Sequence, residues 1–527
     1  MAQSERLAGG GRFAALVALG IFLSRIAGLV RQRVLAHYLG LSDAADAFTA
    51  AFRIPNLLQN LFGEGVLSAS FIPVYARLLA DDDQEEAARV AGAVGALLAL
   101  ATAVLTLAGI WSTPWLIDGI APGFQGEKRE LTIRLVRILF PGMGLLVLSA
   151  WCLGILNSHR RFLLSYTAPV AWNAAIIAAL VAFGGRVGAF DLAAAAAWGS
   201  VAGSALQLLV QLPTVRRVAG RVRPSLDVAS EHVRTVLRNF GPVFVGRGVL
   251  QISAYIDTIL GSLLPAGAVT ALMNAQTLYT LPVSLFGMSV SAAELPAMSS
   301  AQGDREAVAS YLRTRLDAGL RRIAFFVVPS AMAFLALGDV LAAALFQTGR
   351  FTGADATYVW SILAGSAIGL LASTMGRLYA STYYALRDTR TPLRFAVVRV
   401  VLGTTLGSCA ALLLPGLLGV DPRWGAAGLT ASSGIAGWVE FALLRGALRH
   451  RIGRTGLAAS YLTRLWLAAV VAAAAGLAAK LGLGVSQPIL RAGLAVGAFG
   501  GVYLLVTTAL GVNDSRALVR RLTTRPR

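Results

Sequence analysis

Three arginines lie deep within predicted membrane helices, where charge is rare: Arg25, Arg31 and Arg247. A charged side chain at membrane depth is costly, so it faces a water-filled cavity or pairs with another charge. Arginine stays protonated and binds planar oxyanions through two parallel hydrogen bonds. Two chemistries are therefore open. The arginines bind an anionic ligand, or they form interhelical ion pairs, Arg25 with Asp46 and Arg247 with Asp257.

The spacing of nearby polar residues favours a cavity. On one predicted helix Arg247, Gln251 and Thr258 follow helical periodicity, and on the next helix polar residues recur from Asn274 through Thr277. Residues at such spacings share one helix face. We therefore expect the first, seventh and eighth helices to border a wet cavity. The alternative is that these small polar residues serve only helix packing.

The composition predicts a polytopic membrane protein that positions these residues. The chain has 527 residues, of which 56% are hydrophobic and only 14% charged, well below the usual share in soluble domains. Several uncharged runs reach the roughly 20 residues that a helix needs to cross a bilayer. The fold class is all-α, with about 14 transmembrane helices. Their expected ranges are 13–38, 45–78, 88–111, 132–157, 164–185, 190–212, 234–262, 268–297, 318–338, 356–385, 393–415, 424–447, 462–482 and 489–511.

The distribution of positive charge predicts the orientation. With both termini inside, 30 of the 46 basic residues fall in segments on the cytoplasmic side and 7 in segments outside. This asymmetry follows the positive-inside rule. The net charge of +20 is thus mainly a topology signal, and we expect no nucleic-acid partner.

A weak internal repeat predicts the domain organisation. The segment 61–73 ends the second helix and resembles 285–296 at the end of the eighth, six helices later. An even offset relates the repeats by an axis along the membrane normal, as in transporters that bind substrate between two lobes. We expect two pseudo-symmetric six-helix lobes, 1–220 and 221–455, around a central cavity. Two extra helices and a basic cytoplasmic tail occupy 456–527.

The common enzymatic motifs are absent from the sequence. Neither lysine stands in a Walker A motif, no serine stands in GxSxG, and the histidines form no zinc spacing. We therefore expect no enzyme, no catalytic residue, no metal site and no cofactor. The acidic run 81–86 is interpreted as a solvated helix N-terminus rather than a cation site.

The sequence contains a set of motifs that spans nearly the whole chain. The most specific is an N-terminal signature, which comprises 24–31 (SRIAGLVR), 43–48 (DAADAF) and 53–65 (RIPNLLQNLFGEG). The further motifs are 121–124 (APGF), 211–213 (QLP), 241–242 (GP), 345–352 (LFQTGRFT) and 388–392 (DTRTP). Together they resemble the motifs of the MurJ (MviN) family, which lies within the multidrug/oligosaccharidyl-lipid/polysaccharide exporter superfamily.

The resemblance implies a function, a fold and a set of site residues. The family flips lipid II, the undecaprenyl-diphosphate-linked peptidoglycan precursor, across the cytoplasmic membrane. Its fold has fourteen helices in two lobes, with a cationic central cavity and a groove near the last two helices. Some substrate-binding residues are matched to the family position by position, and others are added by the polar pattern. The full set is Arg25, Arg31, Asp46, Asn56, Gln59, Glu64, Arg247 and Thr277.

The chain departs from the family pattern at two of these positions. The family often has arginine where Gln59 and Thr277 stand, and both are missing here. Arg247 is an additional charge, which restores part of the lost charge or indicates a different lipid-linked substrate. Asp257 is a possible site for a coupling ion, or it offsets nearby arginines.

The physical case for a lipid diphosphate is separate from the resemblance. A diphosphate carries about two negative charges and does not cross hydrocarbon unpaired, whereas a polyprenyl tail can remain in lipid. We expect lipid II translocation by alternating access, at the bacterial inner membrane, with membrane lipids as neighbours and a functional link to peptidoglycan synthases. Membrane potential or an ion gradient is a possible driving force. The alternatives are export of another polyprenyl-diphosphate-linked glycan, and a multidrug or cation antiporter, which would favour acidic cavity residues.

Overall fold

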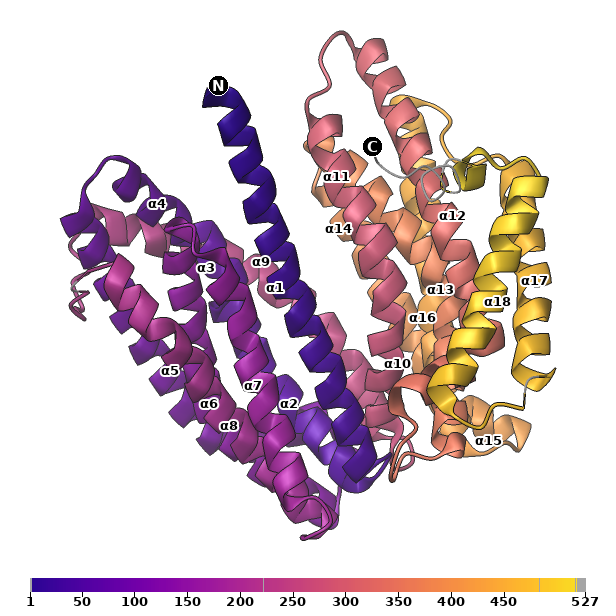
Figure 1. The fold of residues 1–527 in the computed structure, drawn as a ribbon, viewed down its shortest axis with the longest axis horizontal. Coiled ribbons are helices and arrows are strands. Elements are labelled where there is room, and N and C mark those ends of the chain that lie inside the picture. Colours follow the sequence, from indigo (N-terminus) through magenta and orange to yellow (C-terminus); the bar gives the residue numbers. More distant parts are fainter. Residues whose placement is uncertain (1, 221, 483, 517, 519–527) are drawn as a thin grey trace. The chain divides into compact units, whose positions relative to one another are not determined.

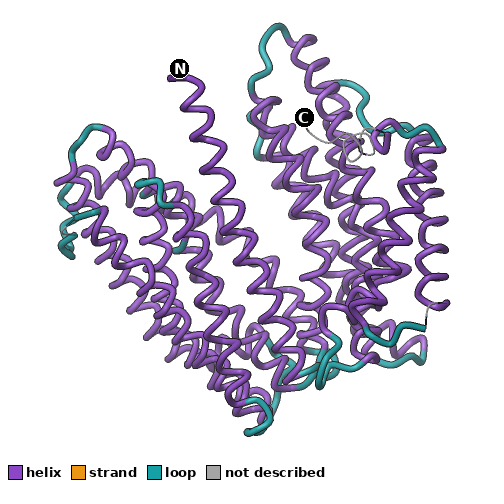
Figure 2. Tube along the Cα trace, in the orientation of Figure 1, coloured by secondary structure: helices purple, strands orange, loops and turns teal. Residues whose placement is uncertain are grey.

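The computed structural model describes residues 2–220, 222–482, 484–516 and 518, and these residues form helices and no strand (Figures 1 and 2). Within the helices, the side chains of residues 2–16, 18, 55, 58, 64, 242–243 and 245–254 lie outside the description. The chain divides into two compact units. One comprises residues 1–269 with 348–351, and the other comprises 270–347 with 352–527.

The N-terminal unit is a bundle in which α1 packs along α7, and α5 and α8 both pack on α6. Its core includes three separate apolar clusters of described residues, of which two are large. The close approach of α1 to α7 depends on Gly20, since a Cβ atom there would lie 2.6 Å from Cβ of Tyr166. Its helices are α1 (Ala2–Leu39), α2 (Asp43–Phe62), α3 (Glu64–Ser70), α4 (Ile72–Ala80), α5 (Gln84–Ile120), α6 (Gly126–Ser158), α7 (Phe162–Phe183), α8 (Ala189–Val218) and α9 (Glu231–Ser262).

The second unit packs α13 between α12 and α16. A Cβ atom at Gly369 of α13 would lie 2.4 Å from Cα of Gly434 in α16, so small residues let these helices approach closely. The α17–α18 hairpin packs on α12, where the Tyr503 hydroxyl donates to the Phe325 carbonyl at 2.8 Å. The elements are α10 (Ala268–Pro282), η1 (Val283–Met288), α11 (Ser289–Ser299), α12 (Arg305–Phe346), α13 (Gly353–Ala385), α14 (Arg390–Ser408), η2 (Cys409–Leu413), α15 (Leu414–Leu418), η3 (Pro422–Trp424), α16 (Gly425–Ile452), α17 (Ala459–Gly482) and α18 (Pro488–Ala509).

The two copies of the repeat both coincide with irregular helix. The first does not continue one helix over 45–78 as predicted, because the chain breaks at Gly63 between α2 and α3 and again at Phe71 between α3 and α4. A Cβ atom at Gly63 would lie 2.2 Å from the Gln59 carbonyl oxygen, so this break requires glycine. The second copy, 285–296, begins in the π-helical turn η1 and continues in α11. Such turns are uncommon and are often found at functional sites.

The prediction of an all-α polytopic membrane protein is confirmed. Eleven helical segments among the described residues are long and apolar enough to cross a membrane. The helices α1, α2 and α9 are not among those eleven, so the count of fourteen stays a prediction. The division into lobes 1–220 and 221–455 with a 456–527 extension also stays a prediction.

The acidic run has the structural role that the sequence predicted. Asp83 caps α5, and its carboxylate accepts the backbone N–H of Glu86 at 3.0 Å. An oxygen acceptor at this position satisfies one of the unpaired N–H groups of a helix start.

Candidate functional site

Arg31 lies over two stacked aromatic rings in the N-terminal unit. Its guanidinium carbon is 5.4 Å from the ring centre of Phe52 on α2 and 5.0 Å from that of Trp172 on α7. The two rings stack at 5.5 Å with 25° between their planes. Among the described residues no acid pairs with Arg31, and its buried Nε has no hydrogen-bond partner. The rings attract the cation without neutralising it, so Arg31 keeps its charge for a ligand.

The aromatic support of Arg31 is itself fixed in place. The Trp172 indole N–H donates to the Ser200 hydroxyl of α8 at 3.1 Å. Gly203 on α8 lets the two backbones approach, since a Cβ atom there would lie 2.7 Å from the Trp172 carbonyl oxygen. Phe48 extends the stack on the other side of Phe52 at 5.5 Å. The guanidinium is therefore held over a surface that does not need to reorganise.

Arg25, six residues earlier on α1, is exposed. The predicted alternative, an ion pair between Arg25 and Asp46, is not formed among the described side chains. Asp46 is 1% exposed, and one of its carboxylate oxygens accepts Lys128 Nζ and the backbone N–H of Gly267, each at 2.8 Å. Asp46 thus joins the start of α2 to α6 and to the connection between α9 and α10.

Close contacts between loops surround this Asp46 junction. Gly123 in the connection between α5 and α6 donates its N–H to the Ser262 hydroxyl at 3.2 Å. The His37 carbonyl at the end of α1 accepts the N–H of Arg350 at 2.8 Å. Gly349 is in the left-handed region at φ 54°, and a Cβ atom there would lie 2.3 Å from that carbonyl oxygen. Glycine is therefore required at position 349, where the two backbones approach each other. The hydrogen bonds of this region connect the ends of the helices to one another.

A second polar contact joins the middle of α2 to α9. Arg53 donates to the Thr258 hydroxyl, and the Tyr255 hydroxyl donates to the Arg53 carbonyl at 3.0 Å. Asp257 directly precedes Thr258 on α9, so the backbone places it near this contact. Its role, as a coupling-ion site or in offsetting positive charge, stays a prediction.

Among the described side chains, no contact gathers the remaining predicted site residues into one cluster. Asn56 and Gln59 are partly exposed on α2, and the Gln59 carbonyl accepts the N–H of Gly63 at 2.7 Å. Thr277 lies on α10 in the second unit, where its hydroxyl donates to the Met273 carbonyl at 2.9 Å. The side chains of Glu64 and Arg247 lie outside the described residues.

Sequence reasoning missed four residues that the structure places in these contacts. Arg53 is the first residue of the signature segment 53–65, and Phe52 directly precedes it. The signature could therefore have pointed to both residues. Lys128 lies 82 residues from Asp46 along the chain, and no sequence spacing connects the two. Trp172 lies in an uninterrupted apolar run, where nothing distinguishes it from a lipid-facing aromatic residue.

Comparison with known proteins identifies the family. The family model described as Lipid II flippase MurJ matches residues 35–494. The chain belongs to the MurJ family. It is 33% identical over 449 residues to the lipid II flippase MurJ of Burkholderia cenocepacia, covering 83% of this chain and 84% of that protein. It is 29% identical over 516 residues to the probable lipid II flippase MurJ of Vibrio cholerae, covering 94% and 95%.

Solved structures share the fold. A lipid II flippase MurJ in an inward closed conformation superposes with a TM-score of 0.75 at 22% identity, covering 96% of this chain and 100% of that one. An inward-facing multidrug resistance MATE family transporter of the MOP superfamily gives 0.64 at 18% identity, covering 81% and 95%. The MurJ family consists of transporters rather than enzymes, and this chain is therefore a transporter.

Proposed function

We propose that this protein translocates lipid II across the cytoplasmic membrane by alternating access. Membership of the MurJ family gives the substrate class. The observation that carries the proposal is Arg31, whose guanidinium lies on Phe52 and Trp172 with no acid partner among the described side chains. A cation held in this way is available to the diphosphate, which it can bind bidentately.

The site comprises the predicted substrate-binding residues together with the support of Arg31. Arg25 and Arg31 contact the diphosphate, and Arg247 supplies charge that Gln59 and Thr277 lack. Asn56 and Glu64 belong to the same site through their place in the signature. Asp46 holds the helix ends together during transport, because its Lys128 and Gly267 contacts join the start of α2 to α6 and to the connection between α9 and α10.

The decisive test is flipping of lipid II in proteoliposomes made with the purified full-length protein. We expect transfer of lipid II between leaflets, and no transfer when Arg31 is replaced by Ala. A protein that moves a cationic drug but leaves lipid II in place would instead support the antiporter alternative. Comparison with a polyprenyl diphosphate that carries a different glycan separates lipid II from other lipid-linked substrates.

The proposal includes fourteen spans in two lobes around a central cavity, with both termini cytoplasmic in the inner membrane. The 30-to-7 charge asymmetry supports this topology. Single cysteines at positions 216 and 350 should be labelled from opposite sides of the membrane. Labelling of both from one side would contradict it.

The energy source and protein partners are further parts of the proposal. Asp257 is the candidate residue for binding a coupling ion. The alternative is that Asp257 balances positive charge, and its proximity to Arg53 supports this alternative. Flipping at zero membrane potential and without ion gradients would remove the coupling role. A functional link to peptidoglycan synthases follows from the substrate, since these enzymes consume flipped lipid II.

A further inference from the structure

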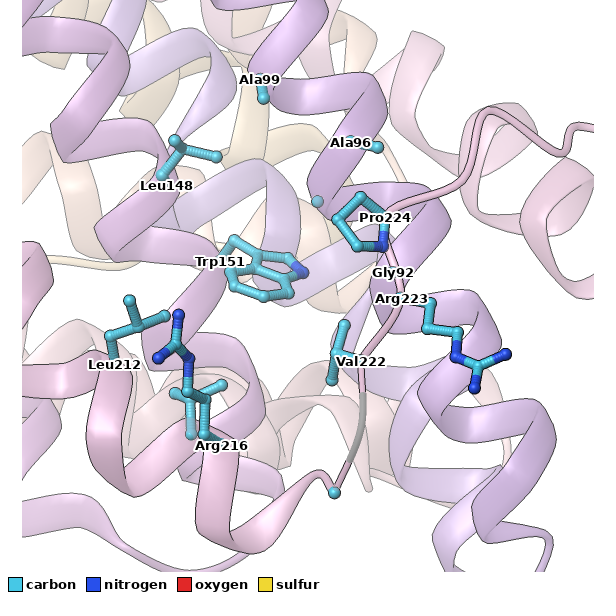
Figure 3. Close-up of a pocket in the computed structure, with 13 residues that line it drawn as sticks. Gly92, Ala96, Ala99, Leu148, Trp151, Leu212, Arg216, Val222, Arg223 and Pro224 are labelled. Carbon is cyan, nitrogen blue, oxygen red and sulfur yellow. The ribbon is translucent and has the colours of Figure 1, made fainter.

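A groove of about 780 Å³ lies in the N-terminal unit, away from Arg31 and its aromatic support (Figure 3). Its floor is α6, through Leu148 and Trp151, because α5 and α8 both pack on this helix. One wall is a strip of small residues on α5 from Gly92 to Ala99. That strip extends over about 10 Å of helix rise.

The connection between α8 and α9 closes one end of the groove. Residues Val222, Arg223 and Pro224 line it there. This loop lies directly on α5, since a Cβ atom at Gly92 would be 2.1 Å from the Arg223 carbonyl oxygen. Trp151 is held as part of the floor by its indole N–H, which donates to the Ala91 carbonyl at 3.1 Å.

The groove continues into faces that a bilayer would cover. Leu100 on α5, one turn after Ala96, is 51% exposed, and Leu209 on α8, one turn before Leu212, is 57% exposed. Both helices belong to candidate membrane spans. Large exposed apolar side chains on a spanning helix face lipid tails, so an acyl chain can enter between α5 and α8.

The charge of the groove is positive. Arg216, near the end of α8, directs its guanidinium beside Leu212 and Trp151, whereas the Arg223 side chain points away (Figure 3). The lining contains no acidic residue, and among the described residues Arg216 has no hydrogen bond or ion pair. Arg217, the next residue, does not line the groove, because it lies about 100° further round the helix.

We propose that this groove binds one anionic phospholipid, with its phosphate on Arg216 and one acyl chain along the strip from Gly92 to Ala99. Anionic headgroups are attracted to basic residues at the membrane surface. An apolar wall without side chains beyond Cβ leaves room for a hydrocarbon chain. This site is distinct from the proposed substrate site and does not depend on which substrate is transported.

The test is native mass spectrometry of the full-length protein in detergent, titrated with dioleoylphosphatidylglycerol or dioleoylphosphatidylcholine. We expect the first phosphatidylglycerol to bind more tightly than the first phosphatidylcholine. Arg216→Ala should weaken that first phosphatidylglycerol about tenfold, because a charge-assisted contact is lost. Arg216→Lys should keep most of the preference.

Two matched variants separate a built site from general surface charge. Arg217→Ala removes the same charge one residue away and should leave the first dissociation constant within about twofold, because an exposed charge outside the groove is screened by water and salt. Ala99→Phe fills the apolar part and should weaken both lipids. If Arg216→Ala lowers the thermal stability of the protein, Ala99→Phe still tests the groove, because it leaves Arg216 in place.

Three outcomes would overturn the proposal. Equal losses for Arg216→Ala and Arg217→Ala would show diffuse attraction only. Unchanged binding of both lipids by Ala99→Phe would show that no chain occupies the groove. Displacement of the first phosphatidylglycerol by added lipid II would assign the groove to the transported lipid.

Discussion

Replacement of Trp172 by Leu tests whether the aromatic support of Arg31 matters for binding. Leu keeps an apolar side chain on α7 but removes the ring that lies 5.0 Å from the guanidinium. Arg31 then loses one cation–π contact, and the side chain is no longer held in one arrangement. Ordering such a side chain on binding costs about 0.5–1.5 kcal/mol. We therefore expect lipid II to bind roughly 2- to 12-fold more weakly.

The assay is the dissociation constant of lipid II for the purified protein, measured beside its thermal stability. Trp172→Phe keeps a ring beneath the guanidinium and should retain most of the affinity. Both variants lose the indole hydrogen bond, so Ser200→Ala is the matched control for that loss. Ser200→Ala should leave binding nearly unchanged, because the ring remains.

A double-mutant cycle with Arg31→Ala provides the refutation. If Trp172 acts through Arg31, Trp172→Leu should cause little further loss of affinity once Arg31 is Ala. An equal loss in both backgrounds would show that Trp172 serves packing alone. The same conclusion would follow if Trp172→Phe were as weak as Trp172→Leu at unchanged thermal stability.

Three other predictions address the proposed charges. Arg25→Ala or Arg31→Ala should abolish growth of cells in which this protein is the only flippase. Lys at either position should restore growth only in part, because lysine lacks the bidentate fork of arginine. Normal growth of the Ala variants at normal protein levels would show that the two arginines are structural. Arg247→Ala should weaken head-group binding while expression and thermal stability stay nearly unchanged, and adding Gln59→Arg should restore part of that binding. A misfolded Ala variant, or no rescue by Gln59→Arg, would contradict the idea that Arg247 replaces the charge missing at Gln59. Hydrogen bonds from Thr391, and then the Arg451 guanidinium, lower the pKa of Asp388 in the connection between α13 and α14 to about 2. Its stabilising effect is complete above the ordinary pKa near 3.8 and is lost as pH falls towards 2, so thermal stability should decline over that range in the protein but less in Asp388→Asn.

The sequence by itself determined the class of protein and its membrane character. Long uncharged runs require helices that bury their backbone hydrogen bonds in a bilayer, and this holds whatever the packing. The N-terminal signature likewise identified the family, because a run such as 53–65 is specific without any knowledge of contacts. The asymmetry of basic residues was equally readable, since it depends on position along the chain.

The partners of the charged residues were decided only by the tertiary structure. Helix periodicity shows which residues share a face, but it does not show what lies opposite. An ion pair between Asp46 and Arg25 was one of two alternatives, yet Asp46 contacts Lys128, 82 residues away along the chain. The support of Arg31 comes from helices α2 and α7, and no spacing links Phe52 to Trp172. The break at Gly63 was also hidden, because glycine occurs within many continuous membrane helices and only the local close approach to the Gln59 carbonyl requires it here.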